Sequence, residues 1–275
     1  MSKTLGVWDR PLPWLRDPAV LAELERLGYQ RVWLGASPPA DLSPVEPMLA
    51  ASTSLAVATG IVNVWDGPPD PAAYARVTSA HPGRFLLGVG VGHPSMVGAR
   101  YTKPYDRLAS YLDGLDEGGV PESGRVLAAL GPRVLRLARD RAAGAHPYLT
   151  TPEHTAQARE ILGAGKLLVP EQKVVLSTDP GQAREIARSQ LAMYLTLSNY
   201  TNNWLRLGFT QADLEDGGSD RLVDALVAWG DEEAIRGRIA EHWDAGADQV
   251  ALQVLNEDKM GVLRALAPTT AGASF

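Results

Sequence analysis

Cysteine is absent from this chain of 275 residues, and no stretch of it is rich in basic residues. Without cysteine there is no disulfide, no thiolate nucleophile and no cysteine-ligated metal site. The net charge of −6 reflects 32 acidic and 26 basic residues. This sign disfavours nucleic acid and anionic membranes, because both carry negative charge. We therefore expect neither nucleic acid nor a membrane as a partner.

Long apolar runs are also missing. No run reaches the roughly 18 residues that a membrane-spanning helix needs, and the first residues contain no signal-peptide core. This predicts a cytoplasmic protein. Because low-complexity segments and linkers are lacking too, we expect one domain over residues 1–275, with the tail from about residue 268 frayed.

What the sequence does contain is an alternation of short apolar runs, several of them β-branched, with helical segments. Strands are expected over residues 5–8, 31–35, 55–63, 85–91, 125–129, 146–149, 174–177 and 249–255. Helices are expected over residues 17–27, 47–54, 71–80, 105–116, 132–143, 152–162, 180–229 with breaks near 200 and 208, 231–245 and 260–267. Eight strands joined to helices by short loops predict an α/β fold, a (β/α)8 TIM barrel. The alternative is an open doubly wound sheet, which needs a glycine loop for phosphate where this chain has Trp8-Asp9-Arg10-Pro11.

The C-terminal ends of barrel strands are where active sites form. Here those ends contain aromatic, hydroxyl and amide side chains and few acids: Trp8, Asp9, Ser37, Asn63, Trp65, Asp66, His93, Arg133, Thr150, Thr151, Ser177, Thr178 and Asn256. Paired carboxylates for glycoside hydrolysis and a G-x-S-x-G elbow are not evident. His146 and His154 have no obvious third ligand, so no metal site is expected. The set favours a broad aromatic ligand over hydrolysis.

The stretch from Gly83 to His93 has glycine at alternate positions, among them Gly90. Alternate glycines remove side chains from one face of a strand, so a flat ligand or another backbone can approach closely. The spacing differs from the G-x-G-x-x-G of a dinucleotide-binding turn. His93 follows this strand at the end where a barrel carries out its chemistry. The alternative is a glycine-softened strand with a surface histidine.

Two predicted helix starts are candidate anion sites. Gly131 and Arg133 flank a proline at one start, where free N–H groups lie beside a guanidinium. The alternative there is an ordinary turn with a surface arginine. Thr150 and Thr151 precede the next helix start. Helix capping accounts for one threonine and leaves the other available to a phosphate.

The segment from Tyr194 to Trp204 is rich in aromatic and amide side chains and includes Tyr200. Residues of this kind either pack helix ends together or line a site. Trp229 and Trp243 are expected on helix faces, in the core or at an interface.

Five segments, in this order, resemble the luciferase-like superfamily of flavin- and deazaflavin-dependent oxidoreductases, over nearly the whole chain. The segments are Glu25–Leu34, Ala58–Asn63, Gly83–Gly90, Ala129–Arg133 and Ala245–Val250. The overall pattern is most similar to the coenzyme F420-dependent branch. Within it, the similarity is to a short subfamily with His93, His146-Pro147-Tyr148 and Ser198-Asn199-Tyr200.

The resemblance implies a TIM barrel, usually a homodimer, with the flavin-type ring in the barrel mouth. It implies that Gly60 and Ile61 form a bulge behind the ring, often with a non-proline cis peptide, and that Asn63 and Gly90 border the cofactor. It further implies phosphate contacts at the two helix starts described above. His93 takes the position where relatives carry a polar residue facing the ring or the substrate.

On this basis we expect a coenzyme F420-dependent oxidoreductase that transfers a hydride between the deazaflavin C5 and a small organic substrate. His93 would give or take the proton, since the pKa of imidazole suits that task. Trp8, Trp65 and Tyr200 would shape the substrate pocket. Two alternatives stay open: an FMN-dependent monooxygenase, and a catalytically inactive cofactor-binding relative.

Several positions depart from the family pattern, and the first of them, the missing acid–histidine pair, is the best support for the inactive alternative. Ala36 and Ser37 stand where many relatives have an acid–histidine pair. Val91 stands where some monooxygenases have a basic residue, and Glu153 where some F420 enzymes have a lysine. The segment between the fourth and fifth strands is short, so the usual substrate-covering insertion is largely missing.

Overall fold

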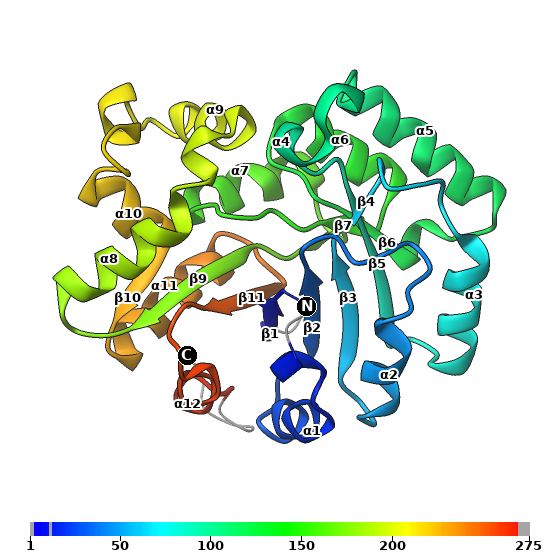
Figure 1. Ribbon diagram of the computed structural model, residues 1–275, viewed down its shortest axis with the longest axis horizontal. Coiled ribbons are helices and arrows are strands. Elements are labelled where there is room, and N and C mark those ends of the chain that lie inside the picture. Colours follow the sequence, from blue (N-terminus) through cyan, green and yellow to red (C-terminus); the bar gives the residue numbers. More distant parts are fainter. Residues whose placement is uncertain (1–2, 11–12, 269–275) are drawn as a thin grey trace.

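The computed structural model describes residues 3–10 and 13–268, and the predicted frayed tail from Thr269 to Phe275 lies outside these residues (Figure 1). The strands are β1 (Thr4–Asp9), β2 (Arg31–Gly35), β3 (Ala56–Gly60), β4 (Val62–Asn63), β5 (Phe85–Gly90), β6 (Arg125–Leu127), β7 (Gly144–Ala145), β8 (Leu167–Leu168), β9 (Glu171–Leu176), β10 (Val227–Gly230) and β11 (Gln249–Val254). The α-helices are α1 (Pro18–Arg26), α2 (Val45–Ala50), α3 (Pro71–Ala80), α4 (Pro94–Val97), α5 (Pro104–Glu117), α6 (Pro132–Arg141), α7 (Pro152–Leu162), α8 (Pro180–Leu191), α9 (Ser198–Arg206), α10 (Asp220–Leu226), α11 (Glu232–Asp244) and α12 (Lys259–Ala265). Short 3-10 turns lie at Pro13–Arg16, Gly98–Arg100, Glu122–Gly124, Tyr194–Thr196 and Gln211–Leu214.

The strands form one parallel sheet in the order β10-β9-β11-β1-β2-β3-β5-β6-β7-β8, with β4 paired to β5. Only Val169 and Pro170 separate β8 from β9, and this segment bonds to β7 on one side and to β11 on the other. The Val169 N–H donates to the carbonyl of Ala145 (3.0 Å), and the Ala251 N–H donates to the carbonyl of Pro170 (3.0 Å). The sheet therefore closes on itself as the predicted (β/α)8 barrel, with β10 added outside the ring.

Several helix starts follow one local rule. Asp17, Asp70 and Asp179 each cap a helix whose first residue is proline, and each carboxylate accepts a backbone N–H of the first turn. A carboxylate there satisfies a donor that the helix leaves free, and proline has no N–H to lose. The predicted bounds of α3 and α7 agree with the structure for this reason.

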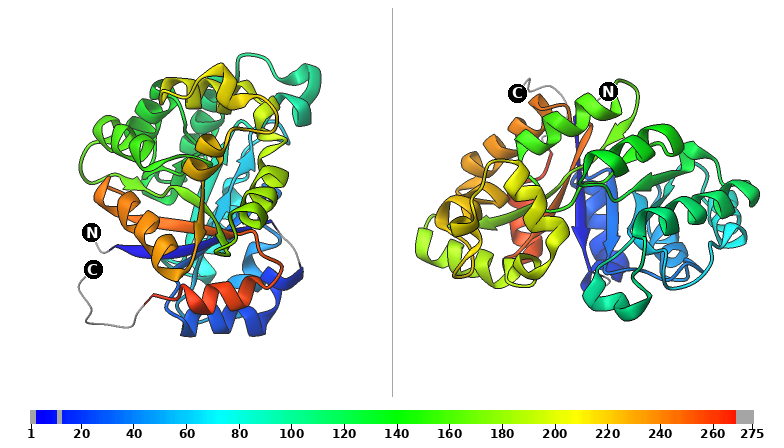
Figure 2. Two further views of the ribbon diagram at one scale, coloured as in Figure 1. Left: turned by 90° about the vertical axis from the view of Figure 1, so that its left-hand side faces the viewer. Right: turned by 90° about the horizontal axis from the view of Figure 1, so that it is seen from above.

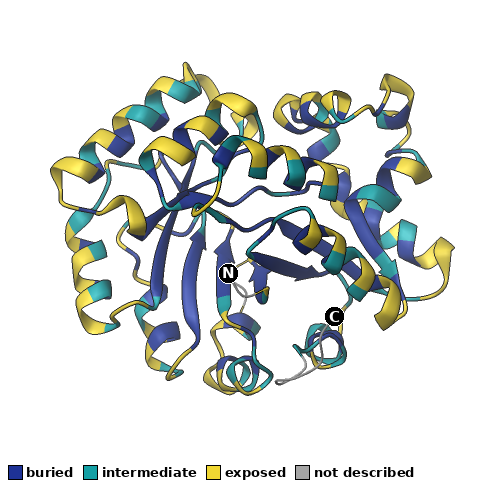
Figure 3. Ribbon diagram, turned by 180° about the vertical axis from the view of Figure 1, so that it is seen from behind, coloured by how far each residue is buried: buried dark blue, intermediate teal, exposed yellow. Residues whose placement is uncertain are grey.

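Two layers of apolar side chains hold the barrel together. The larger core lies between the strands and the surrounding helices, whose outer faces are exposed (Figure 3). A smaller layer fills the inside of the barrel: Trp8, Trp33, Ala58, Leu86, Val126, Val169 and Ala251. A third cluster joins α8, α9 and α10 to β9 and β10, and these helices form a distinct group beside the barrel (Figure 2). No helix among the described residues is long and apolar enough to cross a membrane.

Two sequence expectations about elements were wrong. The sixth strand is Gly144–Ala145 and not 146–149, because Pro147 has no N–H and Leu149 has a positive φ of 57°. The helical stretch 180–229 is broken at Gly208 (φ 91°), as expected, but its last part forms the strand β10 and not a helix. Trp229 therefore lies in β10, paired with β9, and not on a helix face.

Candidate functional site

Aromatic side chains from several elements meet at the C-terminal mouth of the barrel. Their ring centroids are 4.9 Å apart for Trp8 and Tyr148, 5.5 Å for Tyr148 and Tyr194, and 5.0 Å for Tyr194 and Tyr200. His93 completes the set, 5.6 Å from Tyr200. We call these five residues the aromatic cluster. The structure thus brings together three residues predicted for the site, Trp8, His93 and Tyr200, although they are distant in sequence.

The peptide bond between Gly60 and Ile61 is cis, as the resemblance implied. A Cβ atom on Gly60 would lie 2.8 Å from Nε1 of Trp8, and one on Gly90 would lie 2.8 Å from Cγ1 of Ile61. Both distances are too short for a side chain. The two glycines therefore allow Trp8 and Ile61 to approach the strand ends, and they place all four predicted residues in one wall of the mouth.

Asn63 and Trp65 shape the turn that leads to His93. Asn63 is buried, and its Oδ1 accepts the Trp65 N–H at 3.2 Å. The indole N–H of Trp65 donates to the carbonyl of Val91 at 3.0 Å. A Cβ on Gly92, whose φ is 59°, would lie 2.6 Å from Nδ2 of Asn63. Asn63 and Trp65 thus both support the turn at His93, and the indole N–H of Trp65 is already used in a hydrogen bond there.

His93 is half-buried beside the tyrosines of the aromatic cluster. Its Nδ1 is buried and has no hydrogen-bond partner within residues 3–10 and 13–268. Burial lowers the pKa of the imidazole below its usual value, because the charged form loses hydration. The ring is therefore neutral at neutral pH, with a nitrogen left for a ligand.

A second histidine lies beneath the mouth. His146 stacks on Trp33 with ring centroids 4.0 Å apart, and its Nδ1 bonds the carbonyl of Val169 at 2.7 Å. Burial lowers its pKa to about 4. Within the described chain, no group of three or more His, Cys, Asp or Glu side chains could hold a metal ion.

At the start of α6, the cation beside the predicted anion site differs from the one that the sequence analysis named. Gly131 is the N-cap and offers no side chain to the free N–H groups. Arg133 is 69% exposed and lies over the ring of Tyr105, 3.6 Å from its centroid. The side-chain atom nearest to a Cβ on Gly131 is instead Nη2 of Arg206, at 3.8 Å.

The start of α7 matches the capping argument. Thr151 accepts the His154 N–H at 3.4 Å, whereas Oγ1 of Thr150 is buried with no partner among the described residues. Nδ2 of Asn203 is also buried with no partner among the described residues. Oδ1 of Asn203 accepts a hydrogen bond from Nη2 of Arg206 at 3.0 Å. Buried polar atoms without partners are rare in folded proteins, so they indicate a place for a ligand.

Hydrogen bonds hold the segments that carry these groups beside one another. The indole of Trp204 donates to the carbonyl of Leu149 (3.3 Å), and Nε2 of His154 bonds the carbonyl of Leu130 (2.8 Å). The end of α9 therefore lies against the starts of α6 and α7. We call Gly131, Thr150, Thr151, Asn203 and Arg206 the anion cradle. Asn203 and Arg206 were not predicted as site residues, although the amide-rich sequence of this segment was a signal.

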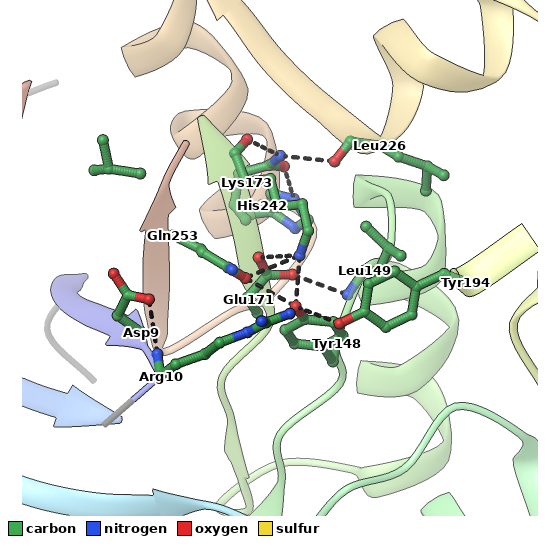
Figure 4. Close-up of polar contacts among 12 residues, drawn as sticks. Asp9, Arg10, Tyr148, Leu149, Glu171, Lys173, Tyr194, Leu226, His242 and Gln253 are labelled. Atoms are coloured by element: carbon green, nitrogen blue, oxygen red, sulfur yellow. Dashed lines mark hydrogen bonds and ion pairs between the residues drawn. The ribbon is translucent and has the colours of Figure 1, made fainter. Parts of the chain in front are cut away.

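Sequence reasoning also missed a polar network inside the barrel (Figure 4). Nζ of Lys173 donates to Oη of Tyr148 (2.7 Å), to Oε1 of Gln253 (2.9 Å) and to Oε1 of Glu171 (3.1 Å). Oε2 of Glu171 accepts the Leu149 N–H at 3.0 Å. The sequence signal for this network was the pair of charged residues at alternate positions of β9. It was missed because the predicted strand began only at residue 174.

The network is enclosed by the barrel. The side chains of Glu171 and Lys173 are 0% and 1% exposed. Burial raises the pKa of Glu171 and lowers the pKa of Lys173, and their mutual attraction opposes both shifts. Burial and the Glu171 charge raise the pKa of Tyr148. Tyr148 is therefore a neutral phenol that can donate a hydrogen bond.

Comparisons with solved structures agree with the barrel. An F420-dependent secondary alcohol dehydrogenase in complex with an F420–acetone adduct has a TM-score of 0.74 at 12% identity, over 97% of each chain. A coenzyme F420-dependent tetrahydromethanopterin reductase from Methanopyrus kandleri has 0.68 at 13% identity, over 97% of this chain and 98% of that chain. Riboflavin lyase with modified FMN and riboflavin has 0.64 at 11% identity, over 97% of this chain and 90% of that chain. No protein-family model matches the sequence, and no curated protein is significantly similar to it. The chain therefore has the luciferase-like barrel fold that the sequence predicted.

Proposed function

We propose that this chain is a luciferase-like oxidoreductase that binds coenzyme F420 and acts on a small organic substrate. One observation carries the proposal: unpaired buried polar atoms, Thr150 Oγ1 and Asn203 Nδ2, lie in an anion cradle connected through Leu149 to the mouth of the barrel. An apolar ring with an anionic tail fits this combination of surfaces. The similarity in fold to F420-dependent enzymes supports the same choice.

The residues present divide the work of binding between two surfaces. Gly60, Ile61, Asn63 and Gly90 would border the ring, because the two glycines let Trp8 and Ile61 pack closely against the strand ends and form one wall of the mouth. The anion cradle would hold the phosphate through the N–H groups at the start of α6, the free hydroxyl and the guanidinium. Arg133 would contribute long-range attraction only, since it is exposed and lies on Tyr105.

When bound, the deazaflavin would supply the hydride chemistry, and the protein would orient the reactants and exclude water. His93 would accept or donate the substrate proton through its neutral ring. Trp8, Trp65 and Tyr200 would bound the substrate, Trp65 through the turn that it supports. Because the rings of the aromatic cluster touch one another, binding would require Tyr194 and Tyr200 to move away from the barrel.

An FMN-dependent monooxygenase is the second candidate, since riboflavin lyase with modified FMN shares the fold. Titration of the purified protein with F420 and with FMN, followed by cofactor fluorescence, separates the two. We expect binding of F420, and about tenfold weaker binding by Arg206→Gln, because a charge-assisted hydrogen bond is lost. Arg139→Gln is the control, as Arg139 pairs with Asp140 on the surface of α6 and with no other side chain among the described residues.

The outcomes of this titration differ clearly. Tight FMN binding without F420 binding would replace F420 by FMN in the proposal, and binding of neither would reject it. F420 binding without turnover on a broad substrate panel would favour the inactive relative, in keeping with Ala36 and Ser37 at the end of β2. We also propose a single functional domain and a cytoplasmic homodimer, which sedimentation and cell fractionation would test.

A further inference from the structure

The Tyr148 hydroxyl lies at the junction of the barrel interior and the mouth. Tyr148 is half-buried, follows β7, and packs against Trp8 of the aromatic cluster. Below it, Lys173 on β9 and Gln253 on β11 are fixed by the strands of the barrel. Above it, the only described partner of its oxygen outside the barrel is the hydroxyl of Tyr194, at 3.0 Å.

The direction of the hydrogen bonds follows from the donors present. The ammonium of Lys173 has no lone pair, so it must donate to Tyr148, Gln253 and Glu171. This uses all three of its protons and one lone pair of the phenol oxygen. The phenol proton is then directed either to Oε1 of Gln253 (2.9 Å) or to Oη of Tyr194. Tyr148 therefore keeps its proton, and the ammonium at its oxygen polarises the O–H bond toward an acceptor.

Tyr194 differs from the other members of this network in its origin. It belongs to the 3-10 turn Tyr194–Thr196, between α8 and α9, and not to the barrel. Its oxygen therefore occupies a position beside Tyr148 that the barrel itself leaves open. We propose that this position is an oxyanion site, in which Tyr148, supported by Lys173, donates a hydrogen bond to the oxygen of a carbonyl substrate.

The substrate class follows from the charge. A carbonyl oxygen gains negative charge as its carbon is reduced, and a neutral donor that faces this oxygen stabilises the change. Glu171 and Lys173 cancel each other, and the guanidinium of Arg10 beside Tyr194 adds a positive charge that favours an oxygen gaining negative charge. Tyr148 would touch the substrate, whereas Lys173 acts through Tyr148 and is a positioning residue. The inference deepens the proposed function and rests on it for the source of the hydride.

The site can be tested without any cofactor by using 4-nitrophenol, whose phenolate absorbs at longer wavelength than the phenol. We expect the protein to bind the phenolate and to lower the pKa of the bound probe. Tyr148→Phe should weaken phenolate binding about tenfold or more, because it removes one hydrogen bond to a charged oxygen. Tyr74→Phe, at a half-buried tyrosine on α3, is the matched control and should not change it.

A second variant addresses the role of Lys173. The double substitution Glu171→Gln with Lys173→Met removes both charges and avoids leaving one of them buried alone. Its bound probe should have a higher pKa than in the unmodified protein, while Tyr148 still permits binding. Thermal unfolding checks that each variant is folded.

The outcomes separate this inference from the proposed function. Failure of the unmodified protein to bind 4-nitrophenolate, or equal binding by Tyr148→Phe, would overturn the oxyanion site. The F420 titration is run on the same samples, and Tyr148→Phe should still bind F420. If F420 does not bind but the nitrophenolate result holds, the proposed cofactor is wrong and the oxyanion site stands.

Discussion

Gly60 and Trp8 lie so close that a methyl group on Gly60 would be 2.8 Å from the indole Nε1. This contact joins the end of β3 to the end of β1 at the mouth of the barrel. It shows why a side chain cannot be accommodated there, and it makes the position a direct test of the proposed ring-binding wall.

The substitution Gly60→Ala should displace Trp8 and narrow the mouth. Overpacking of this kind costs about 1–3 kcal/mol of stability, and F420 affinity should fall with it. Urea unfolding and the fluorescence titration measure the two effects. Gly67→Ala is the control, because a Cβ on Gly67 would have no other atom within 4 Å. Equal behaviour of the two variants would contradict the steric role of Gly60.

The substitution Thr150→Val should have opposite effects on stability and on binding. It removes a buried hydroxyl with no described partner, which should stabilise the ligand-free protein by about 1 kcal/mol. The same change should weaken F420 binding, because the anion cradle loses a donor. Thr155→Val is the contrast: its hydroxyl bonds Nδ1 of His242 at 2.8 Å, so this variant should be destabilised. A loss of stability in Thr150→Val would show that its hydroxyl is already satisfied.

Stability should depend on pH through histidines that are buried in neutral form. Burial lowers the pKa of His146 to about 4 and that of His242 to about 3. Since the folded pKa lies below the unfolded value of 6.5, the unfolded chain binds more protons, and stability falls as the pH drops from about 6.5 towards 4. Each such histidine contributes about 1.4 kcal/mol per pH unit within this window.

The variant His242→Gln should reduce this pH slope by the share of one histidine, as measured by urea unfolding between pH 4.5 and 7. His81→Gln, at the half-buried C-cap of α3, is the matched control variant. An unchanged slope in His242→Gln would mean that His242 does not take up a proton on unfolding.

The ion pair of Glu171 and Lys173 should respond differently to single and double substitution. Glu171→Gln leaves the ammonium of Lys173 buried without its counter-charge, which costs about 3–5 kcal/mol. The double variant Glu171→Gln with Lys173→Met should recover most of this loss. Denaturant midpoints of the three proteins form the comparison, and an absence of recovery would show that the charges are not coupled.

Local rules explain how much of the fold was predictable. The caps at Asp70 and Thr151, each followed by proline, define the starts of α3 and α7, since the donors and acceptors involved are within a few residues. The same capping argument predicted that Thr150 would be left over, and its hydroxyl has no partner among the described residues. The cis peptide at Gly60 came from the resemblance, and not from a local rule.

The parts that sequence reasoning missed depend on contacts between distant residues. Lys173 and Gln253 are 80 positions apart, and only closure of the barrel brings them to the oxygen of Tyr148. Arg206 reaches Gly131 because α9 packs across the start of α6.

The sequence by itself determined the alternation of strands and helices, the helix caps, and the glycines that allow close packing in the wall of the mouth. Those properties arise from backbone conformation and short-range hydrogen bonding. The tertiary structure decided which cation belongs to the anion cradle and which tyrosine accepts a hydrogen bond from the ammonium of Lys173. It also decided where β10 joins the sheet. The physical reason is that burial sets the free energy of an ion pair or of an unpaired hydroxyl. Which groups are buried is fixed only when all the strands have closed into a barrel.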